Sequence, residues 1–128
     1  MRAVDTNVLV RLLVRDDTKQ TAVAESFVAK GAWISHVVLV ETTWVLSSVY
    51  GRSAQQIGDA ITLLLEHEAL VMQDPDVVSL AVAQLRRTSA IGFSDCLILE
   101  IARKAGHLPL GSFDRALGRV EGAHKLRS

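Results

Sequence analysis

The chain has few of the features that would place it quickly in a class of proteins. It contains one cysteine, Cys96, so no disulfide can form within it, and this fits a reducing cytoplasm. No apolar run reaches the roughly 18 residues that span a bilayer, because Arg11 and Arg15 interrupt the first candidate. Asp5 lies where the apolar part of a signal peptide would have to begin. We therefore expect a cytoplasmic protein without membrane association.

An excess of charge of either sign is also missing. Fourteen basic and 14 acidic side chains give a formal net charge of +0. A domain that binds nucleic acid by overall charge alone is usually strongly basic, so a nucleic-acid substrate here requires local basic residues or a metal ion. The charge balance is a mild argument against a pure binding module.

The remaining composition is that of one folded α/β domain over residues 1–128. The hydrophobic fraction is 49% in 128 residues, which is enough for a sizeable core. Short β-prone runs alternate with amphipathic helical runs, which indicates an α/β fold with a largely parallel sheet. The pattern predicts strands at 3–4, 32–34, 69–72 and 108–111, and helices at 6–14, 17–30, 36–50, from 53, from 75 and at 93–105, before a brief helix and an edge strand.

Two acids follow predicted strands, at the edge of a sheet where ligands bind in open α/β folds. Asp5 follows the first strand, and Asp114 follows the strand at 108–111. Each could instead only cap the next helix, since Asp is a favoured N-cap residue.

Two further acids lie among apolar residues on predicted helices. Glu41 has Val37 and Trp44 at helical spacing, and Asp95 has Ile98 and Leu99. Both acids are therefore expected to face inward, where an unpaired charge is costly. The alternatives are an arginine partner or a surface position for Glu41, and a helix-dipole contact for Asp95.

Four carboxylates share a site only if positive charge holds them together. Mg²⁺ and Mn²⁺ suit such oxygen ligands, whereas zinc is less expected because the four histidines show no paired ligand spacing. A site of this kind favours phosphate chemistry.

The four acids lie in the motifs Val4-Asp5-Thr6-Asn7-Val8-Leu9, Val38-Leu39-Val40-Glu41, Phe93-Ser94-Asp95-Cys96-Leu97-Ile98 and Ser112-Phe113-Asp114. These motifs resemble those of PIN-domain ribonucleases. Their order, spacing and the chain length look like the VapC toxins of toxin–antitoxin pairs, and the resemblance covers essentially the whole chain.

The resemblance implies a three-layer α/β/α sandwich and an Mg²⁺- or Mn²⁺-dependent endoribonuclease, homodimeric and inhibited by a small antitoxin protein. It makes Asp5, Glu41, Asp95 and Asp114 the catalytic and metal-binding acids, with Thr6, Asn7 and Ser112 in support. Arg11, Arg15 and Arg115 are candidate contacts for substrate phosphates. Gly92 stands where many relatives have another acid, which weakens a secondary metal position.

Two other functions compete with this hypothesis. A phospho-aspartate protein, either receiver-like or a phosphatase of the haloacid dehalogenase type, also places an Asp beside magnesium. Its phosphatase form needs a second Asp where this chain has Asn7, and Lys125 is too near the end of the chain for a receiver. A catalytically inert interaction module is disfavoured because all four acids are present.

Overall fold

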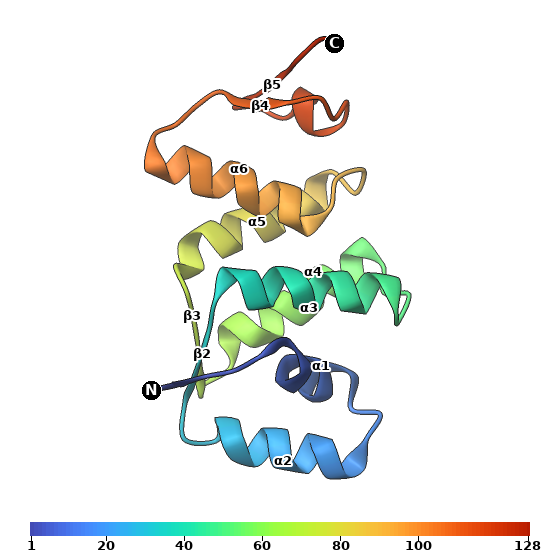
Figure 1. The fold of residues 1–128 in the computed structure, drawn as a ribbon, viewed down its shortest axis with the longest axis vertical. Coiled ribbons are helices and arrows are strands. Elements are labelled where there is room, and N and C mark those ends of the chain that lie inside the picture. The colour runs from blue at the N-terminus through green and yellow to red at the C-terminus, as the bar shows by residue number, and fades with distance from the viewer. The chain divides into compact units, whose positions relative to one another are not determined.

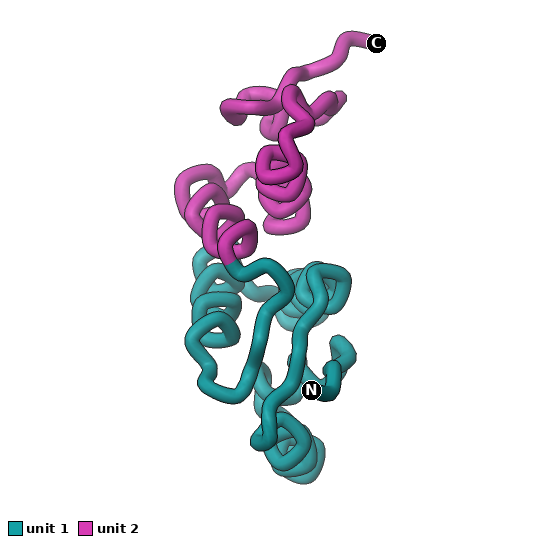
Figure 2. Tube along the Cα trace, turned by 90° about the vertical axis from the view of Figure 1, so that its left-hand side faces the viewer, with its two compact units in different colours: residues 1–75 teal, residues 76–128 magenta.

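Three short parallel strands organise the N-terminal part of the protein. The computed structural model describes residues 1–128 and divides into two units, residues 1–75 and 76–128 (Figure 2), each of which is described by itself. In unit 1 the strands β1 (Arg2–Ala3), β2 (Ala32–Ile34) and β3 (Leu70–Met72) pair in that order. The register sets Ala3 opposite Trp33 and Ile34 opposite Met72.

Four helices complete unit 1 (Figure 1): α1 (Thr6–Val14), α2 (Thr18–Val28), α3 (His36–Ser48) and α4 (Ala54–Glu66). Each begins at a polar side chain that accepts a backbone N–H hydrogen bond, and Ser53 forms a capping box with Gln56. Helix α1 packs against α2 and α3, and α4 packs against β3. The core contains Leu9, Ile34 and Leu39, none of which is exposed to solvent.

Unit 2 contains two helices and a small sheet. Helix α5 (Pro75–Arg87) leads into it, followed by α6 (Phe93–Ala105), β4 (Leu110–Ser112), the 3₁₀ turn η1 (Leu117–Arg119) and β5 (Ala123–Lys125). Strands β4 and β5 are parallel, with Ser112 opposite Lys125. Gly106 ends α6 in the left-handed conformation (φ 81°), which favours glycine.

The elements agree closely with those that the sequence predicts. The α/β class and the parallel pairing of the strands are confirmed, and most helix ends differ from the prediction by no more than two residues. The strand predicted at 108–111 begins later, at Leu110. None of the helices combines the length and the apolar character needed to cross a membrane.

Candidate active site

Asp5 stands at the junction between β1 and α1, as predicted. It is the N-cap residue of α1, and its Oδ1 accepts a hydrogen bond of 2.7 Å from the Thr6 backbone N–H. Asp5 is exposed, and this bond uses only one of its two carboxylate oxygens. Asp5 can therefore cap α1 and still bind a ligand through the other oxygen.

Glu41 lies beside the same junction. The Thr6 hydroxyl donates to Glu41 Oε2 across 2.9 Å, so Thr6 links the start of α1 to α3. The first two acids of the predicted site are thus joined through a single threonine. This contact between residues 35 positions apart is the observation in unit 1 that most directly supports a shared site.

The predicted inward orientation of Glu41 is wrong. Glu41 is exposed, as are its apolar neighbours Val37 and Trp44, at 69% and 67%, whereas Thr42 and Thr43 are buried. Both threonine hydroxyls donate to backbone carbonyls one helical turn earlier, which satisfies them inside the core. The apolar character of α3 extends all round the helix and so does not mark its buried face.

Asp95 occupies the first turn of α6 and is half-buried, so the expectation that it faces inward is met in part. Burial raises the pKa of its carboxyl group above the usual value, and the negative charge of Asp114 raises it further. The charge of Asp114 is therefore close enough to act on Asp95. A bound cation would offset both the desolvation of the Asp95 carboxylate and its repulsion by Asp114.

Asp114 follows β4 and is fixed by its neighbours. Its backbone N–H donates to Ser112 Oγ across 3.0 Å, and its Oδ1 accepts from the Leu117 backbone N–H across 2.8 Å. Asp114 therefore caps the turn that leads into η1, as the alternative from the sequence proposed, and Ser112 holds its backbone in place. The carboxylate remains exposed.

Each unit thus contains two of the four predicted acids. Neither unit brings together three or more His, Cys, Asp or Glu side chains that could hold a metal ion. The donors in each pair are carboxylate oxygens, the ligand type that Mg²⁺ and Mn²⁺ prefer. The convergence of all four acids stays a prediction.

The three arginines predicted to contact substrate phosphates differ in whether their side chains already have partners. Arg11 forms an ion pair with Asp16, and Arg15 forms one with Glu25. Arg115 is exposed and has no hydrogen-bonding or ionic partner. Of the three arginines, only Arg115 can meet a phosphate without first leaving a carboxylate.

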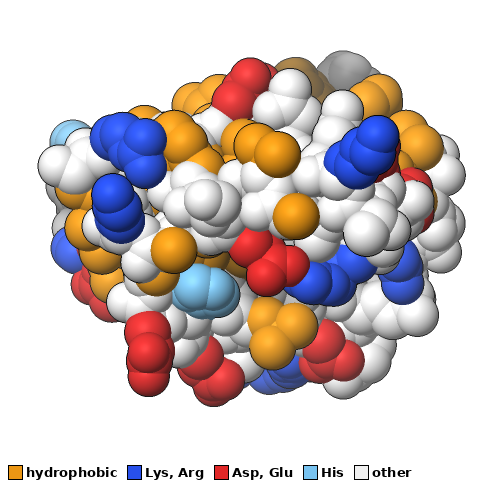
Figure 3. All heavy atoms as spheres, turned by 90° about the horizontal axis from the view of Figure 1, so that it is seen from below, with side chains coloured by type: hydrophobic (Ala, Val, Ile, Leu, Met, Phe, Trp, Pro, Cys, Tyr) orange, Lys and Arg blue, Asp and Glu red, His pale blue; other side chains and the backbone are white.

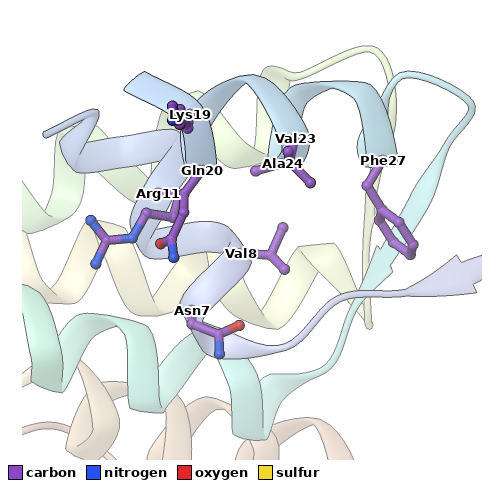
Figure 4. A pocket seen from close by; sticks show the side chains of 8 residues that line it. All are labelled: Asn7, Val8, Arg11, Lys19, Gln20, Val23, Ala24 and Phe27. Atoms are coloured by element: carbon purple, nitrogen blue, oxygen red, sulfur yellow. The ribbon is translucent and has the colours of Figure 1, made fainter. Parts of the chain in front are cut away.

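A surface groove of about 430 Å³ lies between α1 and α2, and its lining includes Asn7, two residues after Asp5. Figure 4 shows Val8 of α1 below Val23 and Ala24 of α2, with Phe27 at one end of the groove and Arg11 at the other. The face of unit 1 seen from the side of α2 mixes apolar, basic and acidic side chains (Figure 3). This face therefore presents no continuous field of one charge.

The comparison with protein families decides between the competing hypotheses. The model of the PIN domain matches residues 2–123, which is nearly the whole chain. The chain belongs to the PIN-domain family. Among solved structures, VapC20 of Mycobacterium tuberculosis, described as a sarcin-ricin loop cleaving toxin, is similar to it. The two chains are 20% identical, each is covered over 100% of its length, and the TM-score is 0.44. No curated protein matches the chain.

Family membership confirms the predicted PIN-like three-layer α/β/α fold and the predicted relation to the PIN-domain ribonucleases, which are hydrolases. The phospho-aspartate hypothesis is thereby set aside.

Gly92, the departure from the PIN motif noted in the sequence, is the N-cap of α6 and gives the helix no side-chain hydrogen bond. A Cβ atom there would meet nothing within 4 Å, so the absence of an acid is not imposed by lack of space.

Two contacts of α6 in this PIN-domain chain were not predicted from the sequence. Glu100 of α6 is only 7% exposed and pairs with Arg103 across 3.2 Å. Arg103 Nη2 also donates to the Glu121 carbonyl across 2.7 Å, which ties α6 to the loop before β5. Cys96 is free and buried, and burial raises the pKa of its thiol to about 11, with Asp95 adding to the effect, which disfavours the reactive thiolate.

Proposed function

We propose that this PIN-domain protein is a metal-dependent endoribonuclease and the toxin of a type II toxin–antitoxin pair. The observation that carries the proposal is the family match over residues 2–123, which includes all four acidic motifs. Its support from the structure is local: Thr6 joins the Asp5 and Glu41 positions, and the charge of Asp114 acts on Asp95.

The proposed function rests on one PIN domain over residues 1–128 whose four acids act together. Asp5, Asp95 and Asp114 would hold Mg²⁺ or Mn²⁺, directly or through water, and Glu41 would ligate the metal or orient the attacking water. The bound ion supplies charge neutralisation of the phosphodiester and a more acidic water molecule. Thr6 holds Glu41 by its hydrogen bond, Ser112 fixes the backbone at Asp114, and Asn7 stands beside the first acid.

The substrate of the proposed enzyme is RNA, and its partners are a small antitoxin and a second copy of the chain. The exposed Val37 and Trp44 of α3 fit an assembly in which further surface becomes covered. Light scattering on the purified protein gives the number of chains in the assembly. Growth arrest on expression, relieved by the product of a neighbouring small reading frame, tests the toxin role.

The activity is tested with purified protein and total RNA. Wild-type protein should cut RNA with Mg²⁺ or Mn²⁺ and stop when EDTA is added. Asp5→Asn and Asp95→Asn should each lower the rate by at least about 100-fold, because each removes a charge from the metal site. Glu68→Gln removes an exposed acid away from the motifs and serves as the matched control. A double Asp5→Asn/Asp95→Asn variant with full activity would overturn the assignment.

A further inference from the structure

The chain has a net charge of zero, but its basic and acidic side chains are divided unevenly between the two units. Residues 1–75 contain six basic and nine acidic side chains, which gives a charge of −3, whereas residues 76–128 contain eight and five, which gives +3. An anionic substrate is attracted to local positive charge even when the whole molecule is neutral. The positive charge of unit 2 therefore makes it the part of the chain that attracts an RNA backbone.

The cations of unit 2 before Asp114 already have partners. Arg87 donates to Gln84, Arg103 pairs with Glu100, and Arg86 and Lys104 are likewise engaged. Four cations follow Asp114, and the side chains of all four are exposed and have no hydrogen-bonding or ionic partner: Arg115, Arg119, Lys125 and Arg127. The only acid among residues 115–128 is Glu121.

The local fold gathers this segment next to Asp114. Lys125 lies opposite Ser112 in the β4–β5 ladder, and the Leu126 backbone N–H donates to the Ser112 carbonyl across 2.7 Å. Lys125 and Leu126 therefore lie beside the end of β4, two residues before Asp114.

A close backbone approach places η1 against β5. A Cβ atom on Gly118 would lie 2.6 Å from the Cβ of Lys125, so only glycine allows this contact. The neighbouring Arg119 is thereby held near Lys125. The hydrogen bond from Arg103 to the Glu121 carbonyl anchors the loop between them.

We propose that residues 115–127 form the surface that contacts the phosphates of the RNA substrate, through Arg115, Arg119, Lys125 and Arg127. This inference rests on the proposed ribonuclease function and specifies which part of the chain binds the backbone on either side of the cut. Unpaired surface cations can exchange their counterions for phosphates, and this release drives association with nucleic acids. Arg11 and Arg15 would first have to break existing ion pairs.

The test compares two variants that each lose two positive charges. Arg119→Gln/Lys125→Gln alters the proposed surface, and Gln keeps the Cβ and Cγ atoms of Lys125 that pack near Gly118. Lys19→Gln/Lys30→Gln removes two exposed, unpaired cations from unit 1 and is the matched control. Binding of a fluorescein-labelled single-stranded RNA of mixed sequence is measured by anisotropy in EDTA over a range of salt concentrations, so that cleavage does not interfere.

The first variant should lose roughly tenfold in affinity at low salt, and its slope of log K against log salt should fall by about 1.4, or 0.7 for each lost contact. The control should keep the affinity and slope of the wild type. Equal losses in both variants, no loss in either, or no RNA binding by the wild type would each overturn the proposal. RNA that is bound through this surface but never cut with Mg²⁺ or Mn²⁺ would instead count against the nuclease function alone.

Discussion

Thr6 makes two contacts at the start of α1, and each involves one acid of the proposed site. Its backbone N–H donates to Asp5, and its hydroxyl donates to Glu41. The backbone contact is available to any residue except proline, whereas the second contact needs a hydroxyl group. Thr6 is therefore a positioning residue for Glu41.

Replacing Thr6 by valine tests this role, because valine has nearly the same shape and lacks the hydroxyl. We expect RNA cleavage to fall about fivefold to tenfold, which corresponds to roughly 1–1.4 kcal/mol for a hydrogen bond to a charged group in an exposed place. Thr6→Ser keeps the hydroxyl and should retain most of the activity. A Thr6→Val enzyme as fast as wild type would show that the bond does not position Glu41.

The raised pKa of Asp95 predicts how stability depends on pH. Its carboxyl group ionises less readily in the folded state than in the unfolded chain, so the ionised group lowers stability at neutral pH. This cost is complete above the raised pKa and disappears as the pH falls below the ordinary value of 3.8. Asp95→Asn should therefore raise the unfolding midpoint in EDTA near pH 7 and have little effect at pH 3.

The contribution of Asp114 can be separated in the same experiment. Asp114→Asn removes the charge and keeps an oxygen that can accept from the Leu117 N–H. The pKa of Asp95, followed by NMR, should fall toward its ordinary value yet stay above it, since burial is the larger cause. An unchanged pKa would show that the two acids do not interact.

At the scale of single elements, helix α6 depends on the pair formed by Glu100 and Arg103. Glu100 is nearly buried, and a buried carboxylate that loses its partner destabilises the fold. Arg103→Gln should lower the free energy of unfolding by about 1–3 kcal/mol, less than for a fully buried pair because Arg103 is partly exposed. Urea unfolding provides the measurement.

Two companion variants separate the effect of charge from that of shape. Arg103→Lys keeps the charge and loses the planar group that reaches both Glu100 and the Glu121 carbonyl, so it should restore only part of the stability. Glu100→Gln/Arg103→Gln removes both charges and should be more stable than Arg103→Gln alone. If the double variant is the less stable of the two, the pair is not the source of the effect.

Local rules account for most of the elements that the sequence predicted. Ser35 and the Ser53–Gln56 box begin helices, and Gly106 ends one, because capping depends on a few adjacent residues. Burial follows different rules. The sequence predicts that Glu41 faces inward, whereas the structure exposes Glu41 and buries Glu100. The face that each helix buries is set by distant segments.

At the scale of the whole molecule, the four acidic motifs in their order were sufficient to predict the family, which the match over residues 2–123 confirms. The structure adds the pairs: Asp5 with Glu41 through Thr6, and Asp95 with Asp114. Sequence order could not show the threonine bridge, because it joins residues far apart in the chain. The charge difference between the units is likewise hidden in a net charge of zero.

If the four acids hold one metal ion, as we propose, replacing any one of them should weaken metal binding. Mn²⁺ is titrated by calorimetry into wild-type protein and into Asp5→Asn and Asp95→Asn, which alter one unit each. We predict a binding event in the wild type that is lost or weakened at least about tenfold in both variants, because each removes a charged ligand from the same ion. Binding that survives unchanged in either variant would contradict a site shared by the four acids.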